Sequence, residues 1–221
     1  MTFQTNFLQI PQYLVEEVSL SSQRNQILEH LLSLDKDSRN NRFNGNVKDS
    51  YIQAYVDSLD KKRDRLYGIF QREVQPVAYD LFSGILPFFP QIVVPQIKPK
   101  IIGLSHISMY SRDGTNLAEL ALSVLNSHQK KGLGSMLVED AILYRAKELG
   151  IEEVICQCLY TNRKVQELLK REGSKISSDI SSNSSQGKIQ IPLGNNLQHI
   201  IRKFRLTPLE TISMIGNRSF I

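Results

Sequence analysis

Cysteine is scarce in this chain, whose 221 residues include only two, Cys156 and Cys158. Two residues apart in one apolar run, they have poor geometry for a disulfide with each other. Two thiols also fall short of the four ligands of a structural zinc site, so we expect no metal. Reduced cysteines packed in a core fit an intracellular protein, and we therefore expect a cytoplasmic location.

Long hydrophobic runs are also absent. The most apolar window, residues 84–95, is interrupted by prolines and falls well short of the ~20 residues that span a bilayer. The first twelve residues, MTFQTNFLQIPQ, lack the basic start and the apolar block of a signal peptide. We therefore expect no membrane association.

Positive charge is in excess but is not concentrated. The net charge is +5, and the 27 lysines and arginines are spread along the chain, with one tight cluster at Arg202, Lys203 and Arg205. A nucleic-acid-binding protein more often has a basic face interleaved with aromatic residues. We therefore expect attraction for small anionic ligands, with nucleic acid an unlikely partner.

The hydrophobic patterns predict one α/β domain over residues 21–195, after an N-terminal segment (1–20) and before a C-terminal extension (196–221) that holds one more amphipathic helix. Residues 35–46 are predicted as a polar turn, and residues 181–187 as a serine-rich hairpin loop. The predicted helices cover residues 22–34, 47–61, about 133–149 and 162–172. The predicted strands cover residues 65–70, 100–110, 117–125, 151–160, 174–180 and 188–193.

Residues 71–100 form an apolar, proline-rich insert with little periodicity, predicted as a long connection. It carries too much apolar surface to leave in water. We expect it beside the entrance for an acceptor substrate, in a subunit contact such as a homodimer interface, or folded over the domain's own core.

The stretch NSHQKKGLGSML, residues 126–137, places two glycines at the start of a predicted helix. Glycine lowers helix stability, so its presence there calls for another reason. Backbone N–H groups at a helix start form an anion site, which the helix dipole and nearby lysines strengthen, and glycine lets an anion approach closely. The stretch therefore predicts a phosphate or pyrophosphate cradle.

Three phosphate-binding patterns can be compared with this loop. The spacing G-x-x-x-x-G-K-[ST] of a Walker loop does not occur. The dinucleotide pattern G-x-G-x-x-G would place its third glycine at Leu137, and the next strand ends without the ribose-binding acid. The pattern Q/R-x-x-G-x-G/A is matched in full by Gln129, Gly132 and Gly134.

Residues 117–173 resemble the GNAT superfamily of N-acetyltransferases. The segments AELALSV, QKKGLG, ELGIEEV and NRKVQELLKREG follow the family's order and spacing. The resemblance implies a mixed, largely antiparallel sheet with splayed central strands flanked by helices. It also implies acetyl-CoA as the acyl donor and an amine as the acceptor.

Carried over to this sequence, the resemblance implies that backbone groups near Val124 pair with the pantetheine arm of the cofactor. The amides from Gln129 to Ser135, including those of Gly132 and Gly134, would hold the pyrophosphate, with Lys130 or Lys131 near the phosphates. Asn162 would lie where the two central strands splay. As an alternative, Asn162 is only the N-cap of the helix that follows.

Glu119 is the candidate general base. On strand parity it shares a face with Ala121 and Ser123, while Leu120, Leu122 and Val124 face the packed side. A lone acid among apolar strand residues is costly to bury, so it should face a wet cleft, where it could take a proton from an ammonium substrate. The alternative is a strand acid that simply faces solvent.

The sequence departs from the family pattern at Leu169, which stands where the family usually has a tyrosine that protonates the departing thiolate. The leading hypothesis is an acetyl-CoA-dependent N-acyltransferase that works by direct attack of a primary amine, since no Ser–His or Cys–His pair stands out. The alternative is a non-catalytic acyl-CoA-binding regulatory module. The acceptor is open between a protein lysine, an N-terminus and a small amine.

Overall fold

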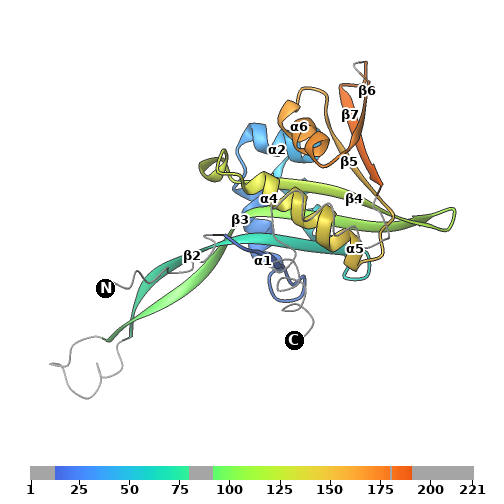
Figure 1. The fold of residues 1–221 in the computed structure, drawn as a ribbon. Helices are drawn as coiled ribbons and strands as arrows, with labels where there is room; N and C mark the ends of the chain where they lie inside the picture. Colours follow the sequence, from blue (N-terminus) through green and yellow to red (C-terminus); the bar gives the residue numbers. More distant parts are fainter. Residues whose placement is uncertain (1–12, 80–91, 180, 191–221) are drawn as a thin grey trace, which may run out of the picture.

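The computed structural model describes residues 13–79, 92–179 and 181–190, which form one seven-stranded sheet with helices on both faces (Figure 1). The strand order is β1-β2-β3-β4-β5-β7-β6. The strands are β1 (Val15–Glu17), β2 (Asp64–Tyr79), β3 (Ile92–Arg112), β4 (Thr115–Val124), β5 (Glu153–Leu159), β6 (Lys175–Asp179) and β7 (Ser184–Gln190). The mixed α/β fold agrees with the fold class predicted from the sequence.

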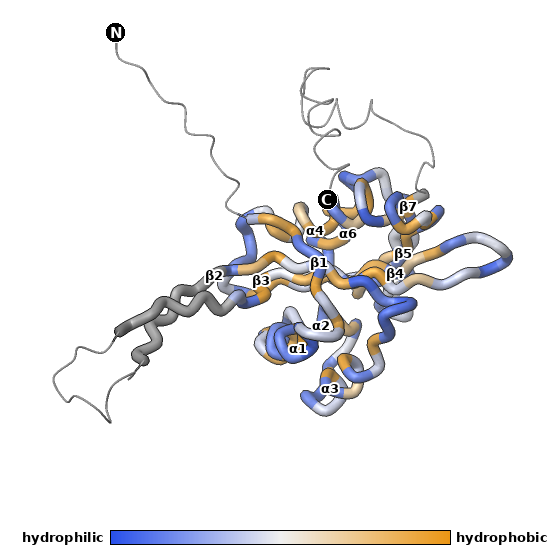
Figure 2. The backbone as a smooth tube through the Cα atoms, turned by 90° about the horizontal axis from the view of Figure 1, so that it is seen from below, coloured by the Kyte–Doolittle hydropathy of each residue, from blue (hydrophilic) through white to orange (hydrophobic). Residues whose placement is uncertain are grey.

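Three helices cover one face of the sheet and the others cover the opposite face, as Figure 2 shows in a view from below. On the first face lie α1 (Arg24–Leu32), α2 (Lys36–Phe43) and α3 (Asp49–Asp57). On the second lie α4 (Leu133–Glu139), the π-helical segment η2 (Asp140–Arg145), α5 (Ala146–Glu148) and α6 (Arg163–Arg171). The segments α4, η2 and α5 follow one another without a break, where the sequence predicts a single helix.

Apolar side chains on both faces of the sheet hold these layers together. Ile27 and Leu31 of α1 and Ile52 and Val56 of α3 have no solvent exposure and pack with buried residues of β2 and β3. On the opposite face, a second buried cluster joins β4 and β5 to the long helix: Ala118, Leu120, Val138, Ala141, Ala146 and Val154. In both clusters the buried residues recur about every 3.6 positions along the helices and every second position along the strands, which are the periods from which these elements were predicted.

The central strands β4 and β5 are the one parallel pair among the described strands, and they separate soon after they meet. Their register joins Leu117, Ala118 and Glu119 to residues 153–155 and goes no further, although β4 runs on to Val124 and β5 to Leu159. Beyond Glu119 the edge of β4 that faces β5 is therefore open. This divergence is the splay that the sequence predicted.

The prediction of a polar turn at residues 35–46 is wrong, because Lys36–Phe43 form α2. The Asp35 side chain caps this helix by accepting from the backbone N–H of Ser38 at 2.7 Å. None of the α2 residues is buried. Without an apolar stripe a helix leaves no periodic signal in its sequence, and this explains why α2 was missed.

The prediction of an irregular connection at residues 71–100 is wrong for its described parts, because β2 and β3 pair with each other as far as Tyr79 and Ile92. Their paired ends project from the body of the protein as a two-stranded ribbon (Figure 1). Strands that pair only with each other need not alternate between apolar and polar residues. The apolar residues 80–91 lie outside the described residues, as does the helix predicted after Gly194.

The remaining predicted elements are present, with boundaries shifted by a few residues. The serine-rich hairpin is shorter than predicted, because Ser184–Gly187 already belong to β7, which pairs with β6. No helix within the described residues combines the length and the hydropathy needed to cross a membrane.

Candidate functional site

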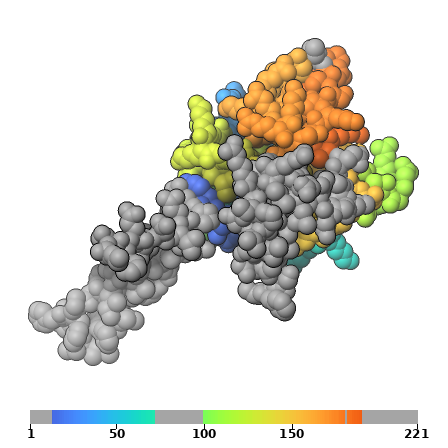
Figure 3. Space-filling view, in the orientation of Figure 1, coloured from blue at the N-terminus to red at the C-terminus, as the bar shows by residue number. Residues whose placement is uncertain are grey.

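A cleft of about 530 Å³ opens where β4 and β5 diverge. This volume is typical of small-molecule sites. Its walls come from five segments that are distant in the sequence: α2 with Asp35, residues 121–124 of β4, the loop and helix start at 126–135, residues 156–158 of β5, and α6 with Asn162. Figure 3 shows residues 126–135, in yellow-green, beside the orange segment that contains α6.

The loop that begins α4 has a conformation that depends on glycine. Gly132 is the N-cap of α4 and has a φ of 80°, in the left-handed region that glycine adopts without strain. Lys130 also has a positive φ, of 61°. The first N–H groups of α4 have no partner within the helix, and they lie at one end of the cleft.

Gln129 fixes the position of this loop. Its Nε2 donates to the hydroxyl of Ser38 on α2 at 3.0 Å and to the carbonyl oxygen of Val124 at 3.2 Å. One side chain therefore joins the loop, α2 and the open end of β4, which form three walls of the cleft.

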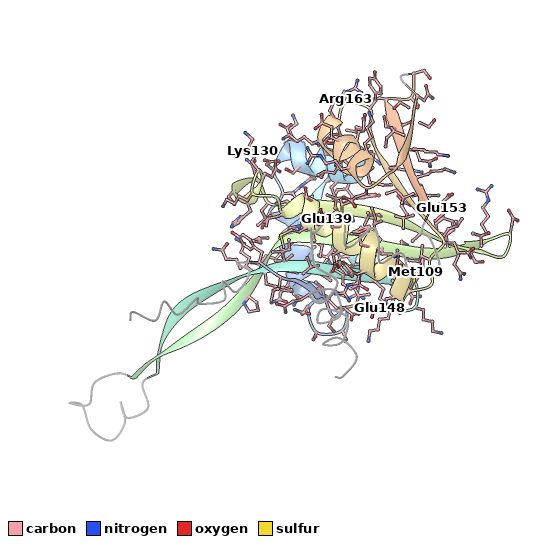
Figure 4. All side chains as sticks on the ribbon, in the orientation of Figure 1. Met109, Lys130, Glu139, Glu148, Glu153 and Arg163 are labelled. Atoms are coloured by element: carbon pink, nitrogen blue, oxygen red, sulfur yellow. The ribbon has the colours of Figure 1, made fainter. Side chains whose placement is uncertain are left out.

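Seven of the nine site residues predicted from the sequence line this cleft: Val124, Gln129, Lys130, Gly132, Gly134, Ser135 and Asn162. Lys131 and Glu119 are not among the described residues that line it. Figure 4 shows Lys130 at the outer edge of the loop, where its side chain is exposed. The structure thus brings together most of the predicted residues, which are spread over about 40 positions of the chain.

Asn162 begins α6 at the far end of the divergence. Its side-chain oxygen accepts from the backbone N–H of Val165 at 3.4 Å, so the predicted N-cap is present. Gln166, one turn later, is buried and donates to the carbonyl oxygen of Tyr160 at 2.8 Å. The Gln166 hydrogen bond holds the start of α6 against the end of β5.

Glu119 is exposed, while its strand neighbours Ala118 and Leu120 are buried, as predicted from strand parity. It occupies the last paired position between β4 and β5, two residues before Ala121, which lines the cleft. Its carboxylate therefore lies at the point of divergence, next to the cleft and open to water.

The two cysteines are reduced and buried, and both line the cleft. Burial raises the pKa of the Cys156 thiol to about 12 and also raises the pKa of Cys158. Both groups are therefore neutral thiols at physiological pH and poor nucleophiles.

A Ser–His pair that the sequence did not reveal joins α1 to β4. His30 Nδ1 lies 2.9 Å from the carbonyl oxygen of Ile101 and must donate to it, so Nε2 accepts from the hydroxyl of Ser123 at 2.9 Å. Burial lowers the pKa of His30 to about 4, which makes it a weak base. The pair is thus better suited to holding α1 on the sheet than to activating the serine.

A second unforeseen group lies on the same face of the sheet. The buried carboxylate of Asp64 accepts from His106 Nε2 at 3.0 Å and from the Ser108 hydroxyl at 2.8 Å. His106 Nδ1 lies 2.7 Å from the hydroxyl of Tyr55, which accepts from Arg42 Nη2 at 2.6 Å. Burial alone would raise the pKa of Asp64, but hydrogen bonds, first from His106 and then from Arg63, hold it well below the usual 3.8.

A sequence signal for this group was the pair of polar residues His106 and Ser108, which lie on either side of the apolar Ile107 in the predicted strand. Within the described residues there is no cluster of three or more His, Cys, Asp or Glu side chains that could hold a metal ion.

The family model of the acetyltransferase (GNAT) family matches residues 59–173, which are more than half of the chain. The chain belongs to the GNAT acetyltransferase family. The match begins just before β2 and ends after α6, so it includes the loop at 126–135 and the diverging strands. Family membership supports acyl transfer as the general activity, and acetyl-CoA is the donor that GNAT enzymes use.

Solved structures with the same fold have low sequence identity to this GNAT chain. The GNAT domain of S. lividans PAT has a TM-score of 0.55 at 15% identity, covering 80% of this chain and 89% of its own. A GNAT acetyltransferase from Streptococcus pneumoniae has a TM-score of 0.53 at 15% identity, covering 82% and 100%.

RimL, a ribosomal L7/L12 alpha-N-protein acetyltransferase solved in complex with coenzyme A, has a TM-score of 0.54 at 9% identity, covering 84% of this chain and 97% of its own. No curated protein sequence matches the chain. At these identities, the structural likenesses support the fold alone.

Proposed function

We propose that this protein is an acetyl-CoA-dependent N-acyltransferase that moves an acetyl group to a primary amine by direct attack. The observation that carries the proposal is that one continuous cleft joins the glycine loop to the place where β4 and β5 diverge. An anion-binding helix start and an open strand edge then lie in one continuous space, and an acyl-CoA needs both.

The residues of the cleft fit a coenzyme A molecule. The N–H groups from Gln129 to Ser135 would hold the pyrophosphate, with Lys130 closer to the phosphates than Lys131, which lies outside the cleft. The open edge of β4 up to Val124 would bind the pantetheine arm as an added strand does. Asn162 would lie near the thioester end, while also capping α6. Once bound, acetyl-CoA supplies the reactive thioester carbonyl.

Glu119 would take the proton from the incoming ammonium, directly or through one water, because it is exposed at the divergence and ends the β4–β5 pairing. Direct attack is favoured over a covalent enzyme intermediate, since both cysteines in the cleft are neutral thiols.

One observation favours a second candidate, a non-catalytic acyl-CoA-binding module. Leu169, at the position of the family's usual tyrosine, is buried and packs against the sheet near Gly187. It offers no hydroxyl to a departing thiolate. Tyr160 is the nearest tyrosine in the sequence, but it lies in the turn just after β5, with the Arg163 guanidinium 4.3 Å from the centre of its ring.

Two measurements test the proposal and separate the candidates. Thermal-shift titration with acetyl-CoA, ATP and NAD tests the cofactor, and a ligand at 100 times its dissociation constant should add about 2.7 kcal/mol of stability. Thiol release and product mass with pools of amines and peptides test the chemistry. Stabilisation by ATP or NAD without any by CoA would overturn both candidates, and CoA binding without transfer to any acceptor would favour the binding module.

A further inference from the structure

Arg42 is a cation that the fold holds in place at the wall of the cleft. Its guanidinium lies 5.0 Å from the ring centre of Phe43 and 5.2 Å from that of Tyr55. Its Nη2 also donates to the Tyr55 hydroxyl at 2.6 Å. Stacking on two rings and one hydrogen bond leave this side chain little freedom.

No acidic side chain among the described residues forms an ion pair with Arg42. Two other half-buried arginines have such a partner: Arg39 lies 2.5 Å from Asp49, and Arg145 lies 3.0 Å from Asp140. Two more, Arg24 and Arg65, donate to backbone carbonyl oxygens instead. Arg42 has no carboxylate oxygen within the 4.0 Å of an ion pair in this part of the chain. A fixed, half-buried cation without a counter-charge is a ready site for an anionic ligand group.

The hydrogen bonds around Tyr55 determine which groups of Arg42 stay free. His106 Nε2 donates to Asp64, and Nδ1 of the same ring lies 2.7 Å from the Tyr55 hydroxyl. The Tyr55 oxygen then accepts from Arg42. Burial raises the pKa of Tyr55, which therefore keeps its proton at neutral pH. In the part of the chain that the structure describes, Nη2 is the one Arg42 nitrogen with a hydrogen-bond partner, so the N–H groups of Nε and Nη1 are left for a ligand.

The position of Arg42 assigns it to the reacting end of the cleft rather than to the phosphate end. The Tyr55 hydroxyl that Arg42 bonds lies 2.7 Å from His106 Nδ1, and His106 of β3 pairs with Ala121 of β4, which lines the cleft. Glu119 lies two residues before Ala121 on the same face of β4 and pairs with Ser108, two residues after His106. Arg42 and Glu119 therefore adjoin neighbouring positions of the β3–β4 pair, at the end where β4 meets β5.

We propose that Arg42 is the carboxylate-binding group of this cleft, which makes the preferred reactants of the proposed acyltransferase carboxylate-bearing. The planar guanidinium matches a carboxylate with two parallel N–H groups. Two molecules could carry that carboxylate, namely the acceptor amine and the acyl chain of the donor. The nearness of Glu119 favours the acceptor, because the carboxylate of Glu119 and the guanidinium of Arg42 could then bind the ammonium and the carboxylate of one zwitterion.

The test compares α-amino acids with the corresponding amino-acid amides, which keep the amine and lose the carboxylate. Thiol release from acetyl-CoA gives kcat/KM for each member of a pair. For the wild-type protein, the free acid of at least one pair should exceed its amide roughly 10- to 100-fold, the usual worth of a charge-assisted hydrogen-bond pair. Arg42→Gln should remove this difference and leave the amide's kcat/KM within about twofold.

Two further variants distinguish binding from folding. Tyr55→Phe keeps both stacked rings and removes the hydroxyl that holds Arg42, so it should weaken the preference for the acid by a smaller factor. Lys36→Gln removes an exposed positive charge from the same helix, outside the cleft, and should leave the preference unchanged. The thermal shift with acetyl-CoA, which should be equal in all four proteins, reports an intact fold.

A second set of assays tests the acyl donor. Succinyl-CoA replaces acetyl-CoA, and the amino-acid amides serve as acceptors. A preference for succinyl-CoA that Arg42→Gln abolishes would support Arg42 as the carboxylate-binding group and assign the carboxylate to the acyl chain. The proposal would be overturned if the wild type used amides as well as acids and also showed no preference for succinyl-CoA. Equal losses of kcat/KM for acid and amide in Arg42→Gln would overturn it as well.

A binding measurement keeps this inference separate from the proposed activity. The CoA-saturated protein is titrated with the amino acids, and unfolding is followed by its midpoint temperature. If nothing is acetylated but the acids stabilise the wild type and not Arg42→Gln, the proposed activity fails and the carboxylate site stands. If neither transfer nor stabilisation by any acid is seen, and succinyl-CoA stabilises both proteins as acetyl-CoA does, the carboxylate site fails.

Discussion

Gln129 Nε2 donates a hydrogen bond of 3.0 Å to Ser38 Oγ, 91 residues earlier in the chain. The contact joins the glycine loop, where we propose that the pyrophosphate binds, to the helix that carries Arg42. The two ends of the cleft are thus fixed to each other by one side chain.

Replacing Gln129 with Ala should therefore weaken acetyl-CoA binding by up to roughly 30-fold, since it removes two hydrogen bonds of about 1 kcal/mol each. Ser38→Ala removes one of the two and should cost less. Isothermal titration of acetyl-CoA into the three proteins measures both effects. Equal affinities for the wild type and Gln129→Ala would mean that the loop keeps its shape without this side chain.

Glu119→Gln should lower turnover by roughly 10²–10⁴ while the affinity for acetyl-CoA barely changes, because the amide keeps the shape of the side chain and cannot take a proton. The loss should shrink at high pH, where the amine arrives deprotonated. Steady-state kinetics from pH 6 to about 10 measure this, with Glu17→Gln, an exposed acid on β1, as the control. Turnover like that of the wild type at neutral pH would leave Glu119 as a surface acid.

Substitutions at the two loop glycines should have different effects, on stability at Gly132 and on cofactor binding at Gly134. Gly132 has a φ of 80° and open space around its Cβ position, so Gly132→Ala should cost about 1–2 kcal/mol of stability through backbone strain. A Cβ at Gly134 would meet Leu168 at 3.4 Å, an ordinary contact, so Gly134→Ala should fold normally. The branched side chain of Gly134→Val would intrude where the backbone approaches the pyrophosphate and should abolish binding. Urea unfolding and CoA titration separate the effects, and the same outcome at both positions would contradict this assignment.

His30 should make the fold sensitive to acid. Its pKa is lowered by burial from 6.5 to about 4, so between these values the unfolded chain binds more protons than the folded one. The stability that this group contributes is full above about pH 6.5 and is lost as the pH falls toward 4, with a total of about 3 kcal/mol. His30→Gln does not titrate, so the difference between the two pH profiles of unfolding isolates His30. Parallel profiles would show that His30 is not buried as a neutral ring.

The parts of the site that the sequence predicted are local ones. The glycine loop, the N-cap Asn162 and the exposure of Glu119 depend on residues within one or two turns of each other, and periodicity and spacing record such relations. The open edge of β4 was also foreseen, but only through the family resemblance.

The parts that were missed depend on pairing across the sheet. His106 lies 42 residues from Asp64 and 51 from Tyr55 in the sequence. The register of β2 against β3 brings Asp64 to His106, and the packing of α3 on the sheet brings Tyr55. Helix α2, which supplies Arg42, is polar except for Phe43 at its end and is held by a cap and by ring contacts rather than by an apolar stripe. Such features cannot be read from periodicity, because each needs a partner from elsewhere in the chain.

The π-helical turn at Asp140–Arg145 means that the long helix contains one residue more than a regular α-helix of the same height. Arg145 Nε donates to Asp140 Oδ2 at 3.0 Å across five positions. In a regular α-helix, side chains five positions apart would point to different sides. A chain with a single deletion inside this turn could close it into a regular helix without rotating either end. Leu137 and Ala146 would then keep their places against the sheet, so related proteins are expected to differ in length by one residue here and still align on both sides.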